Sequence, residues 1–404
     1  MRRSEHELSV GERVAYYRRR RGLSQVALAE LVGRTESWIE KIEHGRAALD
    51  RISVVRELAR VLDVSLQELL PDDLDRVEPY GSSRSVSALR DLVLSYRAVN
   101  PRFALLDSDL AVPSHIELQT MVDDVWTAYQ DSRFGYAITR LNRALPLAYL
   151  ASRHGDVDAH RSLAYLYHVA ASVLVKLGNL DLARVCADRG DIAAQATEDP
   201  ITVTALQRCI AHTLLSNGQY ADAAAVVREG VLGATKLIDG PDPSGLSVTG
   251  TLMLVGAIAS ARADERAEAA AFLRHAERLA DRIGRDRNDV WTAFGPTNVA
   301  IHRVTVAADL GYVQQAIELG SALDVSTVPR ERQARHQLEV ARALSRVARR
   351  DEALHIVLSA ERSAPDQVRR HFLTHELVET WMRTTRTRMD ADLVALARRL
   401  GHAA

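Results

Sequence analysis

The sequence has few cysteines, few aromatic residues and almost no lysine. Two cysteines among 404 residues, Cys186 and Cys209, exclude a disulfide framework and a four-thiolate zinc site, and they favour a reducing cytoplasm. Aromatic residues amount to 5%, so a core has to be built mainly from Leu, Val and Ala. Such segments favour closely packed helices.

Long apolar runs and a net charge are also lacking. We find no uninterrupted apolar run near the roughly 18 residues that span a bilayer, and the charged start of the chain is not followed by the apolar stretch of a secretory signal. We therefore expect no membrane partner. The net charge is −1, so no basic field of the whole chain points to nucleic acid.

Residues 8–72 contain short apolar helical patterns separated by tight turns. Ser24 and Thr35 are good N-caps for two successive helices, and Gly33 lies in the turn between them. Further helices are predicted over residues 52–62 and 66–70, which gives five in this part. Two capped helices with a glycine in the turn are the layout of a helix-turn-helix.

The composition shifts to Pro, Asp, Gly and Ser after this part, and we interpret residues 73–88 as a linker. From residue 89 to residue 404 the pattern is helical, without the alternation of strands. The sequence therefore predicts an all-α chain with a helix-turn-helix domain over 8–72 and a helical repeat domain over 89–404.

A spacing of small residues occurs five times in the C-terminal part. Each copy has a small residue, a turn residue seven positions later and another small residue five positions after that. The copies are Ala171, Gly178, Ala183; Ala211, Gly218, Ala223; Ala257, Asp264, Ala269; Val304, Gly311, Ala316; and Ala341, Ala348, Ala353. Small side chains let two antiparallel helices approach closely, so each copy predicts a helical hairpin and the series predicts a solenoid. An irregular bundle is the alternative, and residues 113–153 are a candidate for a further, degenerate hairpin interrupted by Pro146.

The residues of the first part that carry a family resemblance are Arg18, Gly22-Leu23-Ser24-Gln25, Leu28-Ala29, Gly33, Trp38-Ile39, Ile42-Glu43, Gly45-Arg46, Leu62 and Val64. On these, residues 11–70 resemble the Cro/C1-type helix-turn-helix domain of the XRE family. The C-terminal part resembles tetratricopeptide repeats. The combination is similar to actinobacterial regulators and, more loosely, to peptide-responsive regulators of Gram-positive bacteria.

The resemblance implies that the third helix lies in the DNA major groove. The residues that we expect to contact DNA are Gln25, Arg34, Thr35, Glu36, Ser37, Lys41, His44 and Arg46. Glu36 could accept from cytosine N4 and Lys41 could donate to guanine; alternatively, Glu36 only supports the helix N-terminus. The family pattern further implies that Gln25 holds a phosphate, that Arg18 pairs with Glu43, and that Trp38 belongs mostly to the core.

In tetratricopeptide folds the first helix of each hairpin lines a concave surface. Counted from the small residue of each first helix, the candidate ligand residues are Tyr165, His168, Arg208, His212, Thr251, Asn298, His302, Arg335 and Arg342. Asn298, which follows a helix interruption at Gly295 and Pro296, could clamp a peptide backbone or bond locally at a helix start. Arg208, Arg335 and Arg342 could equally form internal salt bridges.

Enzymatic signatures are missing from the sequence, which contains neither GxxxxGK[ST] nor GxGxxG and no serine nucleophile elbow. His371 and His375 have the spacing of a metal-binding pair on a helix, but no third ligand is evident. We therefore predict no catalytic residue, metal or cofactor. The favoured function is a cytoplasmic, nucleoid-associated regulator that binds a double-stranded DNA operator as a homodimer and a peptide or small-molecule effector. The alternative is a scaffold whose repeats dock a partner protein.

Overall fold

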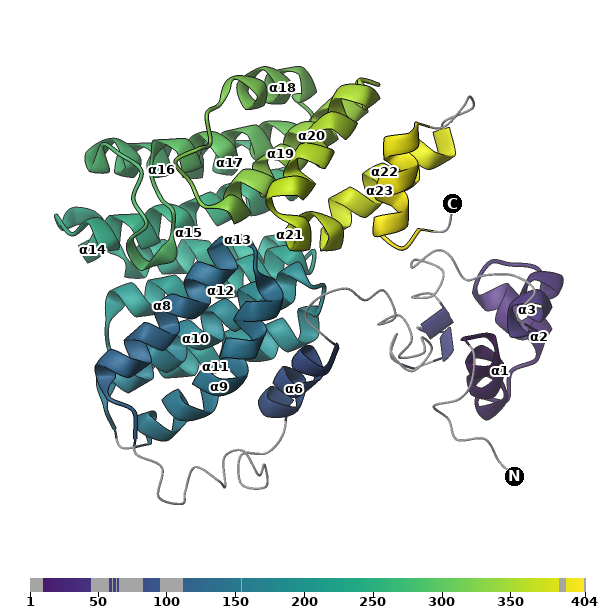
Figure 1. Cartoon of the computed structure of the whole chain (residues 1–404), viewed down its shortest axis with the longest axis horizontal. Coiled ribbons are helices and arrows are strands. Elements are labelled where there is room, and N and C mark those ends of the chain that lie inside the picture. The colour runs from purple at the N-terminus through teal and green to yellow at the C-terminus, as the bar shows by residue number, and fades with distance from the viewer. Residues whose placement is uncertain are drawn as a thin grey trace. The chain divides into compact units, whose positions relative to one another are not determined.

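The computed structural model describes residues 10–44, 58–59, 61–62, 64, 83–94, 112–153, 155–384 and 390–402. Every regular element in these ranges is a helix (Figure 1). The chain divides into two compact units, residues 1–80 and 81–404. The predicted all-α class is confirmed.

The first unit contains α1 (Val10–Arg20), α2 (Gln25–Leu31) and α3 (Glu36–Glu43). Both predicted N-caps are present: the Ser24 hydroxyl accepts from the Ala27 N–H at 3.0 Å, and the Thr35 hydroxyl accepts from the Trp38 N–H at 3.3 Å. Among the described residues, the buried core of this unit includes Val14, Leu28, Ala29, Ile39, Leu58, Ala59, Val61 and Leu62. Most of the predicted helices over 52–62 and 66–70 lies outside the described residues.

The second unit is a stack of helical hairpins. These are α8 (His115–Gln130) with α9 (Phe134–Ser152), α10 (Val157–Lys176) with α11 (Leu180–Gln195), α12 (Pro200–Ser216) with α13 (Tyr220–Gly233), α15 (Pro243–Arg262) with α16 (Arg266–Ile283), α17 (Pro296–Asp309) with α18 (Val313–Ala322), and α19 (Arg330–Arg346) with α20 (Arg350–Ser363). Shorter helices accompany them: α6 (Ser83–Leu94), α14 (Thr235–Asp239), α21 (Pro365–Arg370), α22 (Phe372–Thr384) and α23 (Ala391–Arg399). The core runs along the stack as three apolar clusters, as expected when neighbouring hairpins bury one another.

The turn of each hairpin explains the repeated spacing. In the α10–α11 turn, Gly178 has φ 75°, and the Asn179 N–H donates to the Leu174 carbonyl at 2.9 Å. The equivalent bond is 2.8–3.0 Å long in all six hairpin turns, and the turn residue always has a positive φ. This Schellman geometry favours glycine, yet Asp264 and Ala348 also adopt it, each with φ 61°. The outer residues of the five predicted copies are at most 1% exposed.

The first hairpin of the stack corrects one expectation. Val125, Ser132 and Ala137 repeat the same spacing across α8 and α9, with Ser132 at φ 60°. Pro146 lies inside α9 and does not interrupt it. The start of α6 at Ser83 also places helix within the predicted linker, residues 73–88.

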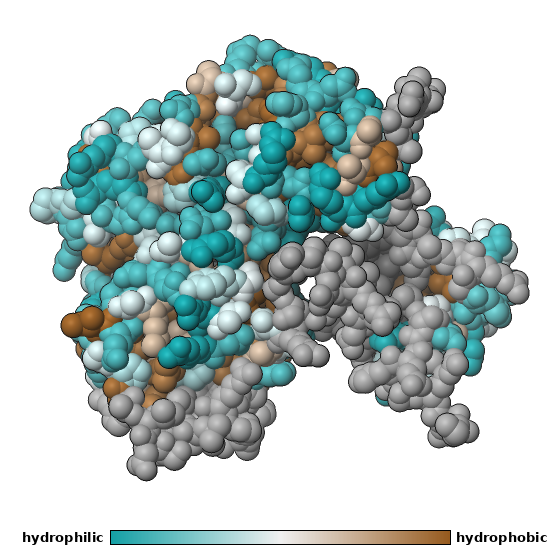
Figure 2. All heavy atoms as spheres, viewed as in Figure 1, coloured by the Kyte–Doolittle hydropathy of each residue, from teal (hydrophilic) through white to brown (hydrophobic). Residues whose placement is uncertain are grey.

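Helix α15 is largely apolar, although serine and threonine residues interrupt its apolar run. Its 20 residues carry no charge before Arg262, and by length and composition the helix could cross a membrane. However, 94% of its most apolar 18-residue window is buried inside the second unit, where α12, α13, α16 and α17 pack against it. A helix surrounded in this way is apolar on all sides. By contrast, Figure 2 shows that the visible surface of the second unit is mostly hydrophilic, with scattered apolar patches.

Candidate functional site

Helix α3 carries three of the side chains that are predicted to contact DNA, those of Glu36, Ser37 and Lys41. The exposed members of the predicted set are Arg34, Thr35, Glu36, Ser37, Lys41 and His44. The Arg34 guanidinium lies 5.6 Å from the ring centroid of Trp38, which is half-buried at the edge of the core. Arg46 lies outside the described residues. The described side chains are therefore accessible on and just before a capped helix.

An ion pair joins α1 to α3, as the family resemblance implies. Nε and Nη2 of Arg18 donate to the Glu43 carboxylate at 2.5 and 2.9 Å, and the Gln25 amide donates to the same carboxylate at 2.8 Å. Burial would raise the pKa of Glu43, but the hydrogen bonds from Arg18 and Gln25 hold this pKa below its ordinary value. Gln25 is thus tied to the ion pair, and its contact with a phosphate stays a prediction.

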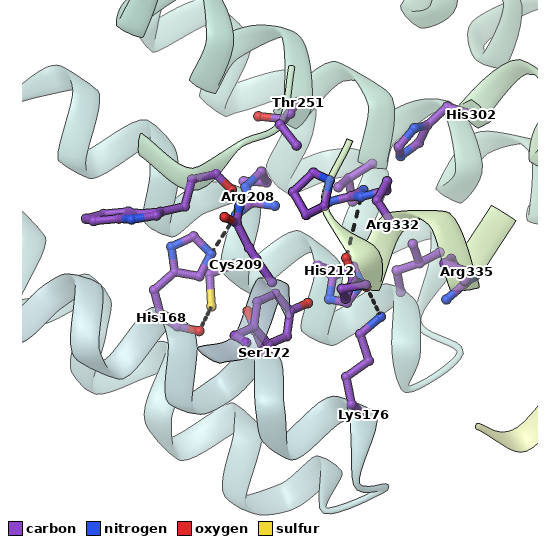
Figure 3. Close-up of a pocket in the computed structure, with 18 of the residues that line it drawn as sticks. His168, Ser172, Lys176, Arg208, Cys209, His212, Thr251, His302, Arg332 and Arg335 are labelled. Atoms are coloured by element: carbon purple, nitrogen blue, oxygen red, sulfur yellow. Dashed lines mark hydrogen bonds and ion pairs between the residues drawn. The ribbon is translucent and has the colours of Figure 1, made fainter. Parts of the chain in front are cut away.

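The second unit encloses a cavity of about 80 Å³, which we call the central cavity. Its lining comes mainly from the first helices of all six hairpins, α8, α10, α12, α15, α17 and α19. Six predicted ligand residues line it: His168, Arg208, His212, Thr251, His302 and Arg335 (Figure 3). The positions counted along the first helices therefore predict side chains that line one cavity, although they are far apart in the sequence.

Three predicted residues lie outside the central cavity. The Tyr165 hydroxyl is 3.2 Å from Thr202 Oγ1, and burial raises the pKa of Tyr165 to about 12. Asn298 is fully buried, with its amide nitrogen 3.5 Å from the Thr292 carbonyl, so its local role is the one observed. Arg342 donates to Asp309 at 2.7 Å and pairs with Glu339 at 2.6 Å, in agreement with the salt-bridge alternative.

Several lining residues were missed from the sequence: Trp126, Tyr129, Gln130, Lys176, Trp291, Glu331 and Arg332. Trp126 directly follows Val125, which has the place in α8 that the first residue of the repeated spacing has in the other first helices. With residues 113–153 as a hairpin, the same spacing predicts Trp126 as a lining residue. Glu331 and Arg332 lie in the first turn of α19, which the count did not reach.

Residues 285–295, which we call the crossing segment, connect α16 to α17 and place Trp291 in the cavity wall. Its only helical turn is η4 (Asp289–Trp291), so the helix is interrupted here as predicted. The Asn288 and Gln130 amides exchange two hydrogen bonds of 2.9 Å. Gly295 is required by close approach, because a Cβ there would lie 2.6 Å from the Asp286 Cα.

The charges around the cavity do not balance. Lys176 pairs with Glu331, whose other oxygen lies 3.6 Å from Arg332 Nε. Arg335 pairs with Glu339 at 3.1 Å. Arg208 Nη2 lies 2.9 Å from His168 Nε2, and no carboxylate partner of Arg208 occurs in the described part of the chain. The lining thus holds four cations and one carboxylate.

The cavity histidines are neutral at physiological pH. Burial, followed by the positive charge of Arg208, lowers the pKa of His168 well below its ordinary value. Burial and then Lys176 do the same to the pKa of His212. Burial and then Arg332 lower the pKa of His302 to about 3. Each neutral ring has one donor and one acceptor nitrogen.

The two histidines with the spacing of a metal-binding pair, His371 and His375, do not lie on one helix. His371 lies between α21 and α22 and accepts from the Leu373 N–H at 3.2 Å, while His375 contacts His402 Nε2 at 3.1 Å and the Arg369 carbonyl at 2.9 Å. Within the described ranges, no group of three or more His, Cys, Asp or Glu residues could hold a metal ion. Both cysteines are buried and free, and burial raises the pKa of the Cys209 thiol to about 12.

Comparison with known proteins gives one family match. Residues 9–71 match the family described as "Helix-turn-helix domain". No curated protein matches the sequence.

The solved structures that are similar to the chain include the following three. PlcR from Bacillus thuringiensis, in complex with the peptide PapR7 and DNA, is 15% identical with a TM-score of 0.35, over 68% of this chain and 95% of that chain. BtubC from P. vanneervenii is 14% identical with a TM-score of 0.39, over 62% and 93%. The apo form of the competence regulator ComR from Streptococcus vestibularis is 13% identical with a TM-score of 0.31, over 83% and 99%. Residues 9–71 of the chain are thus a helix-turn-helix domain, and a stack of tetratricopeptide-like helical hairpins follows it.

Proposed function

We propose that the protein is a sequence-specific transcription regulator that binds a double-stranded DNA operator and senses an effector in the central cavity. The match of residues 9–71 to the helix-turn-helix domain carries this proposal. The exposed residues Glu36, Ser37 and Lys41 on α3 support it, because the N-terminal part of a recognition helix meets base edges in the major groove.

The charge of the first unit favours binding as a homodimer. Residues 1–46 carry +3 and residues 47–75 carry −4, so one copy neutralises few phosphates and binds DNA weakly. Two copies on paired half-sites double those contacts. Half-sites about one helical turn apart are expected when the two heads are rigidly held. This function places the protein in the cytoplasm, at the nucleoid.

The effector is a peptide or a small molecule, and the central cavity is the proposed site for a small one. All six hairpins contribute to its lining, so a ligand there lies where helices from the whole stack meet. A ligand that binds one arrangement of the hairpins more tightly shifts the population toward that arrangement. DNA affinity changes when the favoured arrangement also places the two DNA-binding heads differently.

The test is selection of bound DNA from a random-sequence pool by the full-length protein. The proposal predicts an enriched inverted repeat, and it predicts that Lys41→Ala changes the base preference within each half-site. Arg228→Gln, at an exposed arginine of α13, is the control that keeps the parental motif. A pool without any enriched sequence would contradict the proposal and would favour a scaffold whose repeats dock a partner protein.

A further inference from the structure

Arg208 is the least compensated charge of the central cavity. Its Nη2 faces the neutral ring of His168, and its Nε is buried without a hydrogen-bond partner. Burial, followed by the charge of Arg332, lowers the pKa of Arg208. A guanidinium that is partly withdrawn from water without an anion beside it is costly, so an anion placed beside Arg208 would be stabilised.

Arg332 also has donor capacity left. Arg332 shares the carboxylate of Glu331 with Lys176, and its Nε lies 3.6 Å from one oxygen of that carboxylate. This Nε has no hydrogen-bond partner in the described part of the molecule. Lys176 and Arg335 are engaged by Glu331 and Glu339. Two guanidinium groups, from α12 and α19, therefore remain for a ligand, and in Figure 3 both are drawn in the lining of the same cavity.

Neutral hydrogen-bonding groups complete the polar wall. The His212 ring makes no hydrogen bond to any residue that the structure describes. The Nδ1 of His302 is held 2.8 Å from the Asn298 carbonyl, which leaves its Nε2 for a ligand. A neutral imidazole can donate to an anion without adding charge.

Apolar side chains form another part of the lining, and uncharged polar side chains complete it. The apolar residues include Trp126, Leu215, Val255, Ile258, Trp291 and Ile301, and the polar ones include Gln130, Ser172, Thr213, Thr251 and Thr305. The volume of about 80 Å³ corresponds to about five to eight water molecules, and so to a ligand of similar heavy-atom number. The lining contains no glycine, so the glycine-rich backbone cradle typical of phosphate sites is missing from it. A small ligand with one charged end and an apolar body fits these walls.

We infer that the central cavity binds a small organic acid, with Arg208 and Arg332 as the cationic partners of its carboxylate and the apolar wall around its hydrocarbon part. Arginine suits this role because its planar guanidinium forms paired hydrogen bonds with a carboxylate. The inference rests on the proposed function, and it names the chemical class of the effector.

Tryptophan fluorescence of the full-length protein tests the inference without DNA, because two of the four tryptophans, Trp126 and Trp291, line the cavity. The probes are straight-chain monocarboxylates from acetate to hexanoate, with the matching primary alcohols and inorganic phosphate as controls. We expect a saturable change with carboxylates and none with alcohols. Arg208→Gln should weaken binding about 10- to 100-fold, whereas Arg228→Gln should leave it unchanged. Arg332→Gln provides the same test where Arg208→Gln fails to fold.

The inference is overturned when no carboxylate binds, when phosphate binds in preference, or when both arginine variants bind carboxylates like the parent. A DNA-binding titration separates this failure from failure of the proposed function. A carboxylate that binds without changing operator affinity contradicts effector sensing but leaves the site intact. A peptide that changes operator affinity, with no carboxylate binding, overturns only the present inference.

Discussion

The indole ring of Trp291 stacks on that of Trp126, with ring centroids 5.3 Å apart and ring planes within 4° of each other. Trp291 belongs to the crossing segment between α16 and α17, and Trp126 belongs to α8, the first helix of the first hairpin. The ring of Tyr165, in α10, is inclined by 72° to that of Trp291, with ring centroids 5.1 Å apart. The stacked rings thus join the crossing segment to the first hairpin of the solenoid, and they form one wall of the central cavity.

Removing this stack should loosen the second unit. Trp291→Ala deletes the stacked ring and part of the apolar wall, and we expect a loss of about 1–3 kcal/mol in the free energy of unfolding. Thermal unfolding followed by circular dichroism measures it as a lower melting temperature. Leu232→Ala, at a side chain that is 76% exposed, is the control. Equal effects of the two substitutions would show that the stack contributes nothing.

Two alanines of one helix, one buried and one exposed, test whether the hairpins need small side chains where their helices meet. Ala223 of α13 is fully buried in the same apolar cluster as Ala211 of α12, whereas Ala225 is exposed. Ala223→Leu should destabilise the protein by about 1–3 kcal/mol, because the close approach of the two helices leaves no room for a larger side chain. Ala225→Leu should change the stability by less than about 0.5 kcal/mol. Denaturant unfolding compares them, and a tolerated Ala223→Leu would refute the steric explanation of the repeat.

The hairpins were predictable because their cause is local: a left-handed turn residue and two small residues at fixed spacing. The Arg18–Glu43 pair was predictable for a different reason, because the family pattern implies it. The crossing segment was not predictable in detail, because its contacts, such as Asn288 with Gln130, join residues 158 positions apart without any period. For the same reason Asn298 looked like a groove residue, although its side chain faces the crossing segment.

The stability that the Arg18–Glu43 ion pair gives to the first unit should depend on pH. The pKa of Glu43 is lowered in the folded protein, so the stability that the pair supplies is fully present above the ordinary value of 4.5 and is lost as the pH falls through the lowered pKa. Glu43→Gln should therefore exchange amide hydrogens faster than the parent over residues 10–44 at pH 7, and this difference should shrink below about pH 4.5. Mass spectrometry measures the exchange at matched pH values. A difference that persists unchanged at pH 3 would contradict this account of the pair.

Two substitutions separate base contacts from phosphate contacts. Lys41→Ala should change which operator sequences are bound, because a base contact carries sequence information. Gln25→Ala should weaken binding to all sequences alike, because it loses a predicted phosphate contact and the bond that ties α2 to Glu43. Competition binding with a panel of operator variants measures both. Uniform weakening by Lys41→Ala would show that Lys41 does not read a base.

The central claim is that this chain is a sequence-specific DNA-binding regulator. Genome-wide crosslinking of the protein to DNA in its native host, mapped to single sites, tests it most directly. The account predicts a small number of sharp sites that share an inverted repeat, and the loss or displacement of these sites with Lys41→Ala. Diffuse or absent enrichment, in cells that contain the full-length protein and its effector, would contradict it.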